Sequence, residues 1–590
     1  MAVLLDLRIP RTIDRLVEWL AVAGLAGADV EAWVFEDAAA RAAAEARLAA
    51  CGVAARFRSA YKPLVHHVLE ELDLAEAASL ALRYPVHPDA APARFRMEAY
   101  PLAALAGDIP LTMEPGDAGL EYRLDVVFRD GRRESRSVFA PNRVRPDALG
   151  RPALSPAGWL RIRRAPDGAP DRDETVETDL EAAFAAAMAA VDAHPWGDAQ
   201  PYFDRLRIAV GIGGVERTLP VLDELMSTRE GLHEDLYFSL LERFIRRAGL
   251  PDGDRRLRPG QIAPDIFAAE GDTTVRVETL PHEPPPPDVA AEPVADDATQ
   301  APPPAAVAAS LAQFGGRALL ARSRQGRPVR GVVVAGEGPP VLITGGQHAN
   351  ETSGVVGALR AARELARQGA AFALIPVENP DGYALHQALI ARSPSHMHHA
   401  ARYTALGDDL EYRSAPPYGE AEARREALLL TGADLHINLH GYPAHEWTRP
   451  LSGYAPRGFE AWSIPKGFFL ILRVRPGLQA YGRAFLERLT ARFAPVADLM
   501  AFNRAELAAY AAHAGEVGVP TLNGIACALV ERPEQPCPLQ LITEYPDETV
   551  SGAAFLRAHR VQRDAALFAR ALFAEDVANG LWPPAPGAMA

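Results

Sequence analysis

The sequence predicts an α/β protein of two halves joined by a proline-rich linker. In both halves, short apolar runs typical of strands alternate with longer stretches whose apolar residues recur at helical spacing. Between them, 281-PHEPPPPDVAAEPVADDATQAPPPAA-306 combines proline with acidic residues, which favours an extended, solvated chain. We therefore divide the 590 residues into an N-terminal region over 1–280, a linker over 281–306 and a C-terminal domain over 307–590.

Composition is that of a globular protein and argues against two classes of partner. Apolar residues make up 48% of the chain and charged residues 23%. The 61 basic and 76 acidic residues give a net charge of −15, which argues against nucleic acid or an anionic membrane as the main partner. No apolar run is long enough to cross a membrane, and the first twenty residues lack a signal-peptide layout. Three cysteines are too few for a disulfide framework, so we expect reduced thiols and a cytoplasmic location.

The N-terminal region is predicted to be α/β or α+β, with subdomains over about 1–200 and 201–280. Helical spacing, alternation, an Asp-Gly turn and a Thr-x-x-Glu capping box identify its elements. They are a helix over 13–20, a strand over 30–35, an alanine-rich helix ending at Gly52, a strand over 53–57, a hairpin through Asp130-Gly131, a helix capped by Thr178 and Glu181, a strand over 206–212 and a helix over 228–248.

None of these elements indicates a function. His233 and Glu234 lie on the last helix, but no second histidine follows at the spacing of a zinc-binding helix. We expect this pair on a solvated face. The role of residues 1–280 and the oligomeric state stay open.

The C-terminal half contains a stretch in which an apolar run is followed by potential metal-binding residues, 341-VLITGGQHANETSG-354. A predicted strand ends in a glycine turn and is followed by a helix that stops at Gly369. His348 and Glu351 thus lie where the carboxyl end of a strand meets a helix, the place where open α/β sheets bind ligands. Their spacing lets the two side chains converge, and both types of group suit Zn²⁺. Alternatively, Glu351 only stabilises the first turn of the helix.

A second strand supplies a third candidate ligand. In 433-ADLHINLHGYP-443, alternation places His436 and His440 on one face, with His440 at the end of the strand. A catalytic zinc site needs three protein ligands and one open position, which His348, Glu351 and His440 would provide. His436 lies four residues earlier on the strand, and we interpret it as a buried, hydrogen-bonded histidine behind the ligands.

A late strand, 539-LQLITEYPDE-548, delivers Glu544 at its end. A carboxylate in that position can act as the general base on a zinc-bound water and then protonate the leaving amine. Glu531 is the alternative base, but it opens a proline-rich loop. We therefore prefer Glu544.

Together these motifs resemble the zinc carboxypeptidase (metallocarboxypeptidase, funnelin) family over about residues 310–575. The matching residues are His348-x-x-Glu351 after Gly-Gly, Asn379-Pro380-Asp381-Gly382-Tyr383, His440-Gly441-Tyr442 and Glu544. The resemblance implies a mixed eight-stranded sheet flanked by helices, with one zinc ion at its carboxyl edge. It also implies hydrolysis of a peptide or amide bond next to a terminal carboxylate, with an arginine that stabilises the oxyanion.

One family motif is altered in this chain. In the family, a stretch of the type Gly-x-Asp-x-Asn-Arg binds the terminal carboxylate of the substrate. The corresponding 407-GDDLEYR-413 keeps Asp409, a partner for His348, but has Glu411 and Tyr412 at the Asn and Arg positions. Glutamate would repel an anion, and tyrosine cannot reproduce the bidentate contact of a guanidinium.

The substrate anchor is therefore left open by the sequence. Arg402 is the best candidate for the oxyanion or carboxylate arginine, and Arg413 is the alternative for the carboxylate. Glu411 would instead favour a basic group on the substrate. Tyr442, beside the candidate ligand His440, is a further substrate-binding candidate, and 396-HMHH-399 stays unassigned.

Three functions are compatible with these residues. The first is a zinc carboxypeptidase of non-standard specificity that acts on a peptide or small amide. The second is an N-acyl amino acid deacylase or amidase, resembling the succinylglutamate desuccinylase and aspartoacylase branch. The third is a non-catalytic binding scaffold, which would predict a broken ligand set or a missing base.

Overall fold

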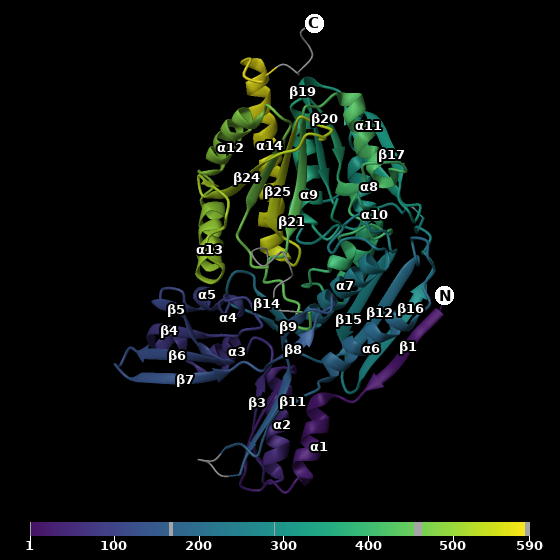
Figure 1. The fold of residues 1–590 in the computed structure, drawn as a ribbon. Helices are drawn as coiled ribbons and strands as arrows, with labels where there is room; N and C mark the ends of the chain where they lie inside the picture. The colour runs from purple at the N-terminus through teal and green to yellow at the C-terminus, as the bar shows by residue number, and fades with distance from the viewer. Residues whose placement is uncertain (1, 165–168, 288, 453–462, 584–590) are drawn as a thin grey trace.

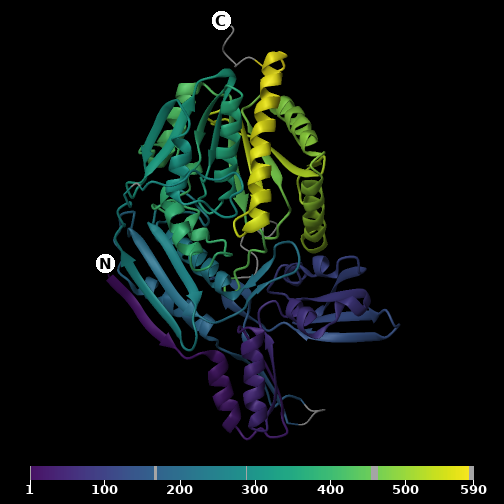
Figure 2. The same cartoon turned by 180° about the vertical axis from the view of Figure 1, so that it is seen from behind.

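The computed structural model describes residues 2–164, 169–287, 289–452 and 463–583. The C-terminal half forms the upper body in Figure 1, and three sheets of the N-terminal half lie below it; Figure 2 gives the view from behind. The predicted α/β class is confirmed. Within the described ranges, no helix is both long and apolar enough to span a membrane.

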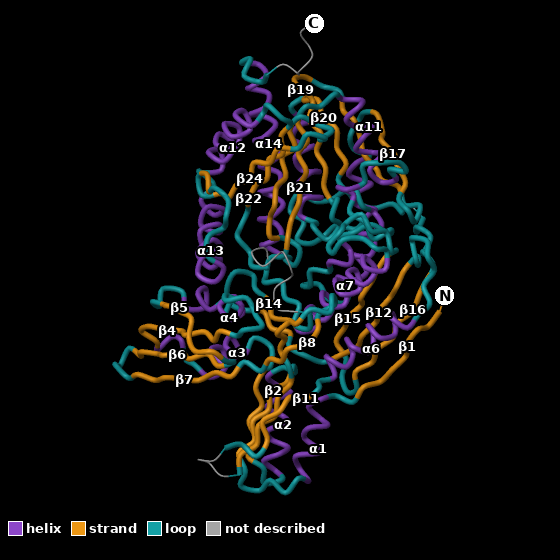
Figure 3. The backbone as a smooth tube through the Cα atoms, viewed as in Figure 1, coloured by secondary structure: helices purple, strands orange, loops and turns teal. Residues whose placement is uncertain are grey.

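The C-terminal half is built on one mixed sheet flanked by helices (Figure 3). The sequence resemblance implies eight strands, and the structure has nine because the two-residue edge strand β23 gives no recognisable sequence pattern. In spatial order the strands are β17 (Arg317–Arg322), β18 (Pro328–Val334), β20 (Ala370–Ile375), β19 (Glu337–Gly345), β21 (Leu435–Tyr442), β25 (Leu539–Pro546), β22 (Phe469–Val474), β24 (Ile525–Glu531) and β23 (Thr521–Leu522).

Strand direction determines where side chains of this sheet can meet. Strands β20, β19, β21 and β25 are parallel to one another, so their carboxyl ends lie at one edge. Strand β22 runs antiparallel to β25, and β24 runs parallel to β22. The ends of β24 and β25 therefore lie at opposite edges of the sheet.

Alternation along β21 separates the core from the functional face. Leu435, Ile437 and Leu439 pack in the main core with the apolar sides of α9, α14 and α12. His436 and His440 point to the opposite face. The helices of this half are α8 (Pro304–Leu311), α9 (Ser353–Arg367), α10 (Pro380–Ile390), α11 (Glu422–Thr431), α12 (Gln479–Phe493), α13 (Ala497–Ala514) and α14 (Gly552–Ala578).

The N-terminal half forms three four-stranded sheets. The first has the strand order β1-β16-β12-β15. In it, the strand at the beginning of the chain pairs with the strand before the linker, so this sheet contains residues of both predicted subdomains, about 1–200 and 201–280. Its strands are β1 (Ala2–Ile9), β16 (Thr273–Leu280), β12 (Arg205–Ile212) and β15 (Gln261–Ala268). The others are β11-β10-β2-β3 (Arg172–Val176, Gly158–Arg163, Asp29–Val34, Ala54–Ser59) and β5-β4-β6-β7 (Leu111–Ala118, Ala77–Val86, Glu121–Phe128, Arg133–Phe139).

The local elements predicted for this half are present in the structure. Thr178 and Glu181 form the predicted capping box of α6, each side chain accepting a hydrogen bond from the backbone N–H of the other residue. The helices are α1 (Thr12–Val22), α2 (Ala38–Ala50), α3 (Pro63–Glu71), α4 (Arg94–Glu98), α5 (Leu102–Ala106), α6 (Asp179–Ala193) and α7 (Thr228–Arg247). Two short ribbons, β8-β9 (Asn142–Pro146, Pro152–Pro156) and β13-β14 (Glu216–Thr218, Leu225–Ser227), complete the half.

Helix α7 lies between the two halves of the chain (Figure 1). Glu230 is 2.6 Å from His445 Nε2, and Glu234 is 2.8 Å from His399 Nδ1, so its carboxylates contact loops of the C-terminal half. His233 and Glu234, which we expect on a solvated face, are 1% and 0% exposed. That expectation is wrong because loops of the C-terminal half pack on the polar side of the helix. The amphipathic sequence of the helix alone gives no sign of this burial.

The proline-rich segment carries no helix or strand over 281–287 and 289–303. Its later part is nevertheless fixed to the C-terminal half. Val294 is buried in the main core, its N–H donates to Ser310 Oγ at 2.8 Å, and its carbonyl accepts from Arg363 Nη2 at 2.6 Å. These contacts make Val294 part of the core of the C-terminal half.

We expect Val294→Ala to lower the free energy of unfolding by about 2 kcal/mol, because two buried methyl groups are lost and a small cavity remains. Val289→Ala is the matched control, since Val289 is 65% exposed and should change stability little. Chemical denaturation of both variants checks this. Equal losses in the two would contradict a specific contact at Val294.

Candidate metal centre

Three ligand-type side chains meet at the carboxyl edge of the C-terminal sheet. His348 and Glu351 come from the turn between β19 and α9, and His440 comes from β21. Their candidate ligand atoms all lie within 4.8 Å of one another. His348 Nδ1 is 2.7 Å from Glu351 Oε1, and His440 Nδ1 is 2.9 Å from Glu351 Oε2 and 3.0 Å from His348 Nδ1. We call these three residues the metal group.

The donor set fits a zinc ion. Two imidazole nitrogens 3.0 Å apart cannot both direct a proton at each other, so at least one lone pair faces inward. Glu351 Oε2 is buried beside His440 Nδ1, at 2.9 Å, and a cation bound between the two imidazoles would compensate the charge of this buried carboxylate. Two imidazoles and one carboxylate are the donors of many catalytic zinc sites, which keep a fourth position for water or substrate.

Two glycines let the backbone bring the group together. Gly346 adopts a φ of 57°, which turns the chain from β19 towards α9. Gly441 follows His440, and a Cβ there would lie 1.8 Å from Asp547 Oδ1. Asp547 Oδ2 in turn accepts a hydrogen bond from Ser353 N at 2.8 Å, at the start of α9. The absence of a side chain at Gly441 thus allows β21, β25 and α9 to meet closely.

Arg402 contacts the carboxylate of the metal group, with Nη1 2.6 Å from Glu351 Oε1. Burial opposes the charge on Glu351, but His348, Arg402 and His440 outweigh it and hold the pKa well below its usual range. Asn379 Nδ2 donates to the Arg402 carbonyl at 3.3 Å, and Asn379 Oδ1 caps α10. The Asn-Pro-Asp-Gly turn therefore helps to position Arg402.

The other side of His348 is held by Asp409, as the sequence suggests. His348 Nε2 is 3.2 Å from Asp409 Oδ2, which leaves Nδ1 facing the metal group. Burial and Arg402 lower the pKa of His348, but Glu351 and Asp409 outweigh them and raise it to about 9. His436 lies outside the group and is buried, with Nε2 2.8 Å from Thr344 Oγ1.

Glu544 lies beside the metal group because it pairs with His440 in the β21–β25 register. Burial, followed by the charge of Glu351, raises the pKa of Glu544 well above its usual range. The alternative base, Glu531, is exposed and lies at the end of β24, level with the beginning of β25. The geometry therefore leaves Glu544 beside the group and places Glu531 at the opposite edge.

Residues 411–413 do not present a guanidinium to the metal group. Glu411 is paired with Arg473, and Tyr412 is 53% exposed. Arg413 is buried and uses all three of its nitrogen atoms within its own loop, including contacts to Asp408 at 2.6 Å and to Glu420. Arg413 is thus a structural residue of this loop.

Tyr442 also has its hydroxyl engaged away from the metal group. The hydroxyl donates to the Gly467 carbonyl at 2.6 Å and accepts from the Lys466 N–H at 3.0 Å. Its ring packs with Phe469 at the beginning of β22. Tyr442 therefore fixes the turn before β22.

The N-terminal half borders the metal centre, which sequence reasoning missed. His396 Nε2 is 2.9 Å from Glu216, and Met397 N donates to Glu230 at 2.7 Å, so β13 and α7 hold the loop that leads to Arg402. The only sequence signal was 396-HMHH-399, a histidine-rich loop without carboxylates nearby in sequence. Its acidic partners lie about 170 residues earlier in the chain.

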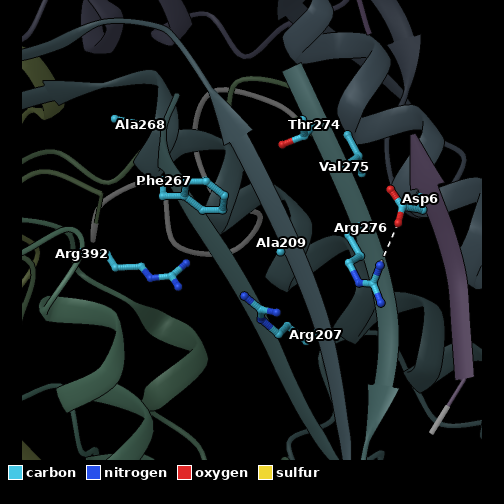
Figure 4. A pocket seen from close by; sticks show the side chains of 9 residues that line it. All are labelled: Asp6, Arg207, Ala209, Phe267, Ala268, Thr274, Val275, Arg276 and Arg392. Atoms are coloured by element: carbon cyan, nitrogen blue, oxygen red, sulfur yellow. Dashed lines mark hydrogen bonds and ion pairs between the residues drawn. The ribbon is translucent and has the colours of Figure 1, made fainter. Parts of the chain in front are cut away.

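A hollow of about 680 Å³ lies on one face of the β1-β16-β12-β15 sheet, where Arg392 of the C-terminal half also lines it (Figure 4). Three arginines line it. Arg207 is 2.7 Å from Asp265, Arg276 is 2.7 Å from Asp6, and Arg392 is 3.0 Å from Asp265. Because each guanidinium is already paired with a carboxylate, we assign no function to this hollow.

A His-Glu-His group at the carboxyl edge of a mixed α/β sheet is the arrangement of a zinc peptidase. Residues 317–456 match the model of the zinc carboxypeptidase family, Peptidase_M14. The predicted resemblance to zinc carboxypeptidases is thus confirmed over residues 317–456. The matched range contains the metal group, Arg402 and Asp409, and it ends before Glu544. No curated protein matches the chain.

Solved structures similar to this chain include two bacterial metallo-carboxypeptidases. The one from Burkholderia cenocepacia is 17% identical, with 53% of this chain and 77% of that chain covered and a TM-score of 0.28. The one from Pseudomonas aeruginosa, in complex with (2-guanidinoethylmercapto)succinic acid, is 16% identical, with 52% and 76% covered and a TM-score of 0.28. A succinylglutamate desuccinylase/aspartoacylase from Rhodobacter sphaeroides is 16% identical, with 44% and 66% covered and a TM-score of 0.22.

We expect His440→Ala to lose bound zinc, because one of three protein ligands is removed. His436→Ala is the matched control, since His436 lies on the same strand and face but outside the metal group. Zinc content after dialysis, measured by inductively coupled plasma mass spectrometry, should fall from about one ion per chain to a small fraction only in the first variant. Full zinc content in His440→Ala would refute the ligand assignment.

Proposed function

We propose that the chain is a zinc-dependent hydrolase of the carboxypeptidase type that cleaves a peptide or small amide. The observation that carries this proposal is the convergence of His348, Glu351 and His440, with Glu544 opposite His440 on the next strand. The three residues of the metal group would hold one zinc ion. When bound, the ion lowers the pKa of a water molecule and polarises the carbonyl group of the substrate.

The residues around the group have distinct roles in this proposal. Glu544 accepts the proton of the attacking water and passes it to the leaving nitrogen. Burial raises the pKa of this carboxyl, which makes it a stronger base than an exposed carboxylate. Arg402, 2.6 Å from Glu351, donates to the substrate oxygen that gains negative charge. Asp409 orients the imidazole of His348 through its Nε2.

Non-standard specificity is part of the proposal. Tyr412 cannot supply the family's bidentate contact to a carboxylate, and Arg413 is fully engaged in its loop. The same observation favours a second candidate, a deacylase or amidase that acts on N-acyl amino acids. The two candidates share the metal group and the base, so the substrate distinguishes them.

We expect the zinc-loaded protein to shorten peptides with free C-termini, and Glu544→Gln to lower kcat by about 10²–10⁴-fold, because general acid–base catalysis is lost. Glu531→Gln is the matched control and should keep full activity, since this exposed carboxylate lies at the far edge of the sheet. Mass spectrometry of a mixed panel follows the products. The panel holds free peptides, the same peptides amidated, and N-acyl amino acids.

Each result has a defined meaning. Cleavage of amidated peptides or N-acyl amino acids in place of free peptides would favour the deacylase or amidase. No product from any substrate, with zinc bound, would favour a non-catalytic scaffold. Unchanged activity in Glu544→Gln would refute the proposed base.

A further inference from the structure

Two loops of the C-terminal half reach the metal centre from the side of the N-terminal half. The first covers residues 396–402 and ends at Arg402, and we call it the Arg402 loop. The second covers residues 443–452 and follows β21, which carries His440, and we call it the His440 loop. Both loops contact α7, so a helix of the N-terminal half lies behind two parts of the centre.

Three buried carboxylates of α7 make these contacts. Glu234 contacts the Arg402 loop, 2.8 Å from His399 Nδ1, and accepts from the N–H of the same residue at 3.3 Å. Asp235 contacts the His440 loop and accepts from the backbone N–H groups of residues 451 and 452 at 2.7 and 2.9 Å. Glu230 differs from both of them because it contacts the two loops at once.

The two oxygens of Glu230 are divided between the loops. Oε1 accepts a hydrogen bond from the Met397 N–H at 2.7 Å, and Oε2 is 2.6 Å from His445 Nε2. All three residues are buried. The backbone of Glu230 is itself fixed, since its N–H donates to the helix cap Ser227 Oγ at 3.0 Å. One carboxylate of the N-terminal half therefore bridges both loops.

The Met397 end of this bridge leads to the first strand of the metal group. The Met397 carbonyl accepts from Asn350 Nδ2 at 3.0 Å, and Asn350 directly precedes the ligand Glu351. Arg402, which contacts Glu351, lies five residues after Met397 in the same loop. The backbone of Met397 thus connects Glu230 to the turn that carries two of the three candidate ligands.

The His445 end leads to the other strand. His445 follows the ligand His440 by five residues. Burial lowers the pKa of His445, but the charges of Glu230, Glu224 and Glu216 outweigh burial and raise it. A charged imidazole and a carboxylate form a charge-assisted hydrogen bond, which is stronger than one between neutral groups.

We propose that Glu230 is a positioning residue of the metal centre, which fixes Arg402 and the end of β21 relative to each other. This inference rests on the proposed function, because it concerns residues that would hold the zinc ion and stabilise the oxyanion. A zinc site needs its ligands from both strands at fixed separations, and small displacements of a catalytic group are costly. The N-terminal half, whose role the sequence leaves open, is therefore required for hydrolysis.

Hydrogen exchange in the zinc-loaded protein tests this without turnover. Glu230→Gln keeps the size of the side chain but replaces one acceptor oxygen by a donor, so it cannot accept from both loops. We expect amide exchange, followed by mass spectrometry, to accelerate in both 396–402 and 443–449. The expected factor is about 10- to 100-fold, the typical effect of one hydrogen bond to a charged group.

Asp235→Asn is the matched control, since it changes a buried carboxylate of the same helix that contacts the His440 loop alone among the two loops. It should accelerate exchange at residues 450–452 and leave 396–402 unchanged. The release of zinc to a chelator is the second readout. Glu230→Gln should speed this release about 10-fold, and Asp235→Asn should not.

A double variant distinguishes positioning from general destabilisation. His445→Gln, added to Glu230→Gln, supplies a side-chain carbonyl that can accept from the amide introduced at position 230. We expect the double variant to recover part of the slow exchange in both loops and part of the slow zinc release, so the two changes are not additive.

Three results would overturn the proposal. These are equal acceleration of exchange in 396–402 by Glu230→Gln and Asp235→Asn, unchanged exchange in 396–402 in Glu230→Gln, and unchanged zinc release in that variant. Circular dichroism verifies folding. If Glu230→Gln does not fold, His445→Ala breaks the same bridge from its other end. It should speed exchange in 443–449 and zinc release, and unchanged zinc release would equally overturn the proposal.

The two proposals fail independently. In an active enzyme, Glu230→Gln should lower kcat about 10- to 100-fold, because Arg402 and the zinc ligands lose their fixed separation. Faster exchange and zinc release in this variant, without cleavage of any substrate by the native protein, would refute the hydrolase and leave Glu230 as a positioning residue. Equal kcat in the variant and the native protein would overturn the positioning role and leave the hydrolase.

Discussion

The charge on Glu351 is the constraint that organises the catalytic half. A carboxylate that is 1% exposed must be compensated, and His348, His440 and Arg402 surround it for this purpose. Each of these groups has its own support, such as Asp409 behind His348. The loops that carry these supports are therefore as constrained as the strands. A metal ion between the two imidazoles and the carboxylate would complete the same balance of charge.

The N-terminal half extends this balance across the contact between the two halves. Helix α7 directs Glu230 and Glu234 at His445 and His399, and Arg258 lies 3.0 Å from Asp408. Buried charges of this kind are costly when one partner is missing, so they favour one relative placement of the halves. The loop that leads to Arg402 is held in part by residues of the other half. The N-terminal half thus supports a loop that contributes Arg402 to the metal centre.

The sequence predicted those features that depend on local pattern. The turn with His348 and Glu351 and the end of β21 with His440 follow from strands that finish in glycine, and the capping box of α6 follows from four residues. Two kinds of feature were not predictable from local pattern: the relative direction of strands that are distant in sequence, and the burial of a residue by distant loops. Local cues favoured Glu544 over Glu531, but the placement of Glu531 at the opposite edge depends on β24 running antiparallel to β25, which the sequence does not reveal. The burial of Glu234 depends on loops that lie more than 160 residues further along the chain.

The pairing of β1 with β16 has a consequence for how the chain is made. Residues 2–9 are synthesised well before their partner strand, which ends at residue 280. At about 5–20 residues per second, roughly 15–55 s pass before this edge of the sheet can close. During that time an unpaired strand is open to wrong partners, and Asp6 and Arg8 on it are the kind of charge that discourages such pairing. Closure of this edge of the sheet therefore has to wait for the synthesis of residues 273–280.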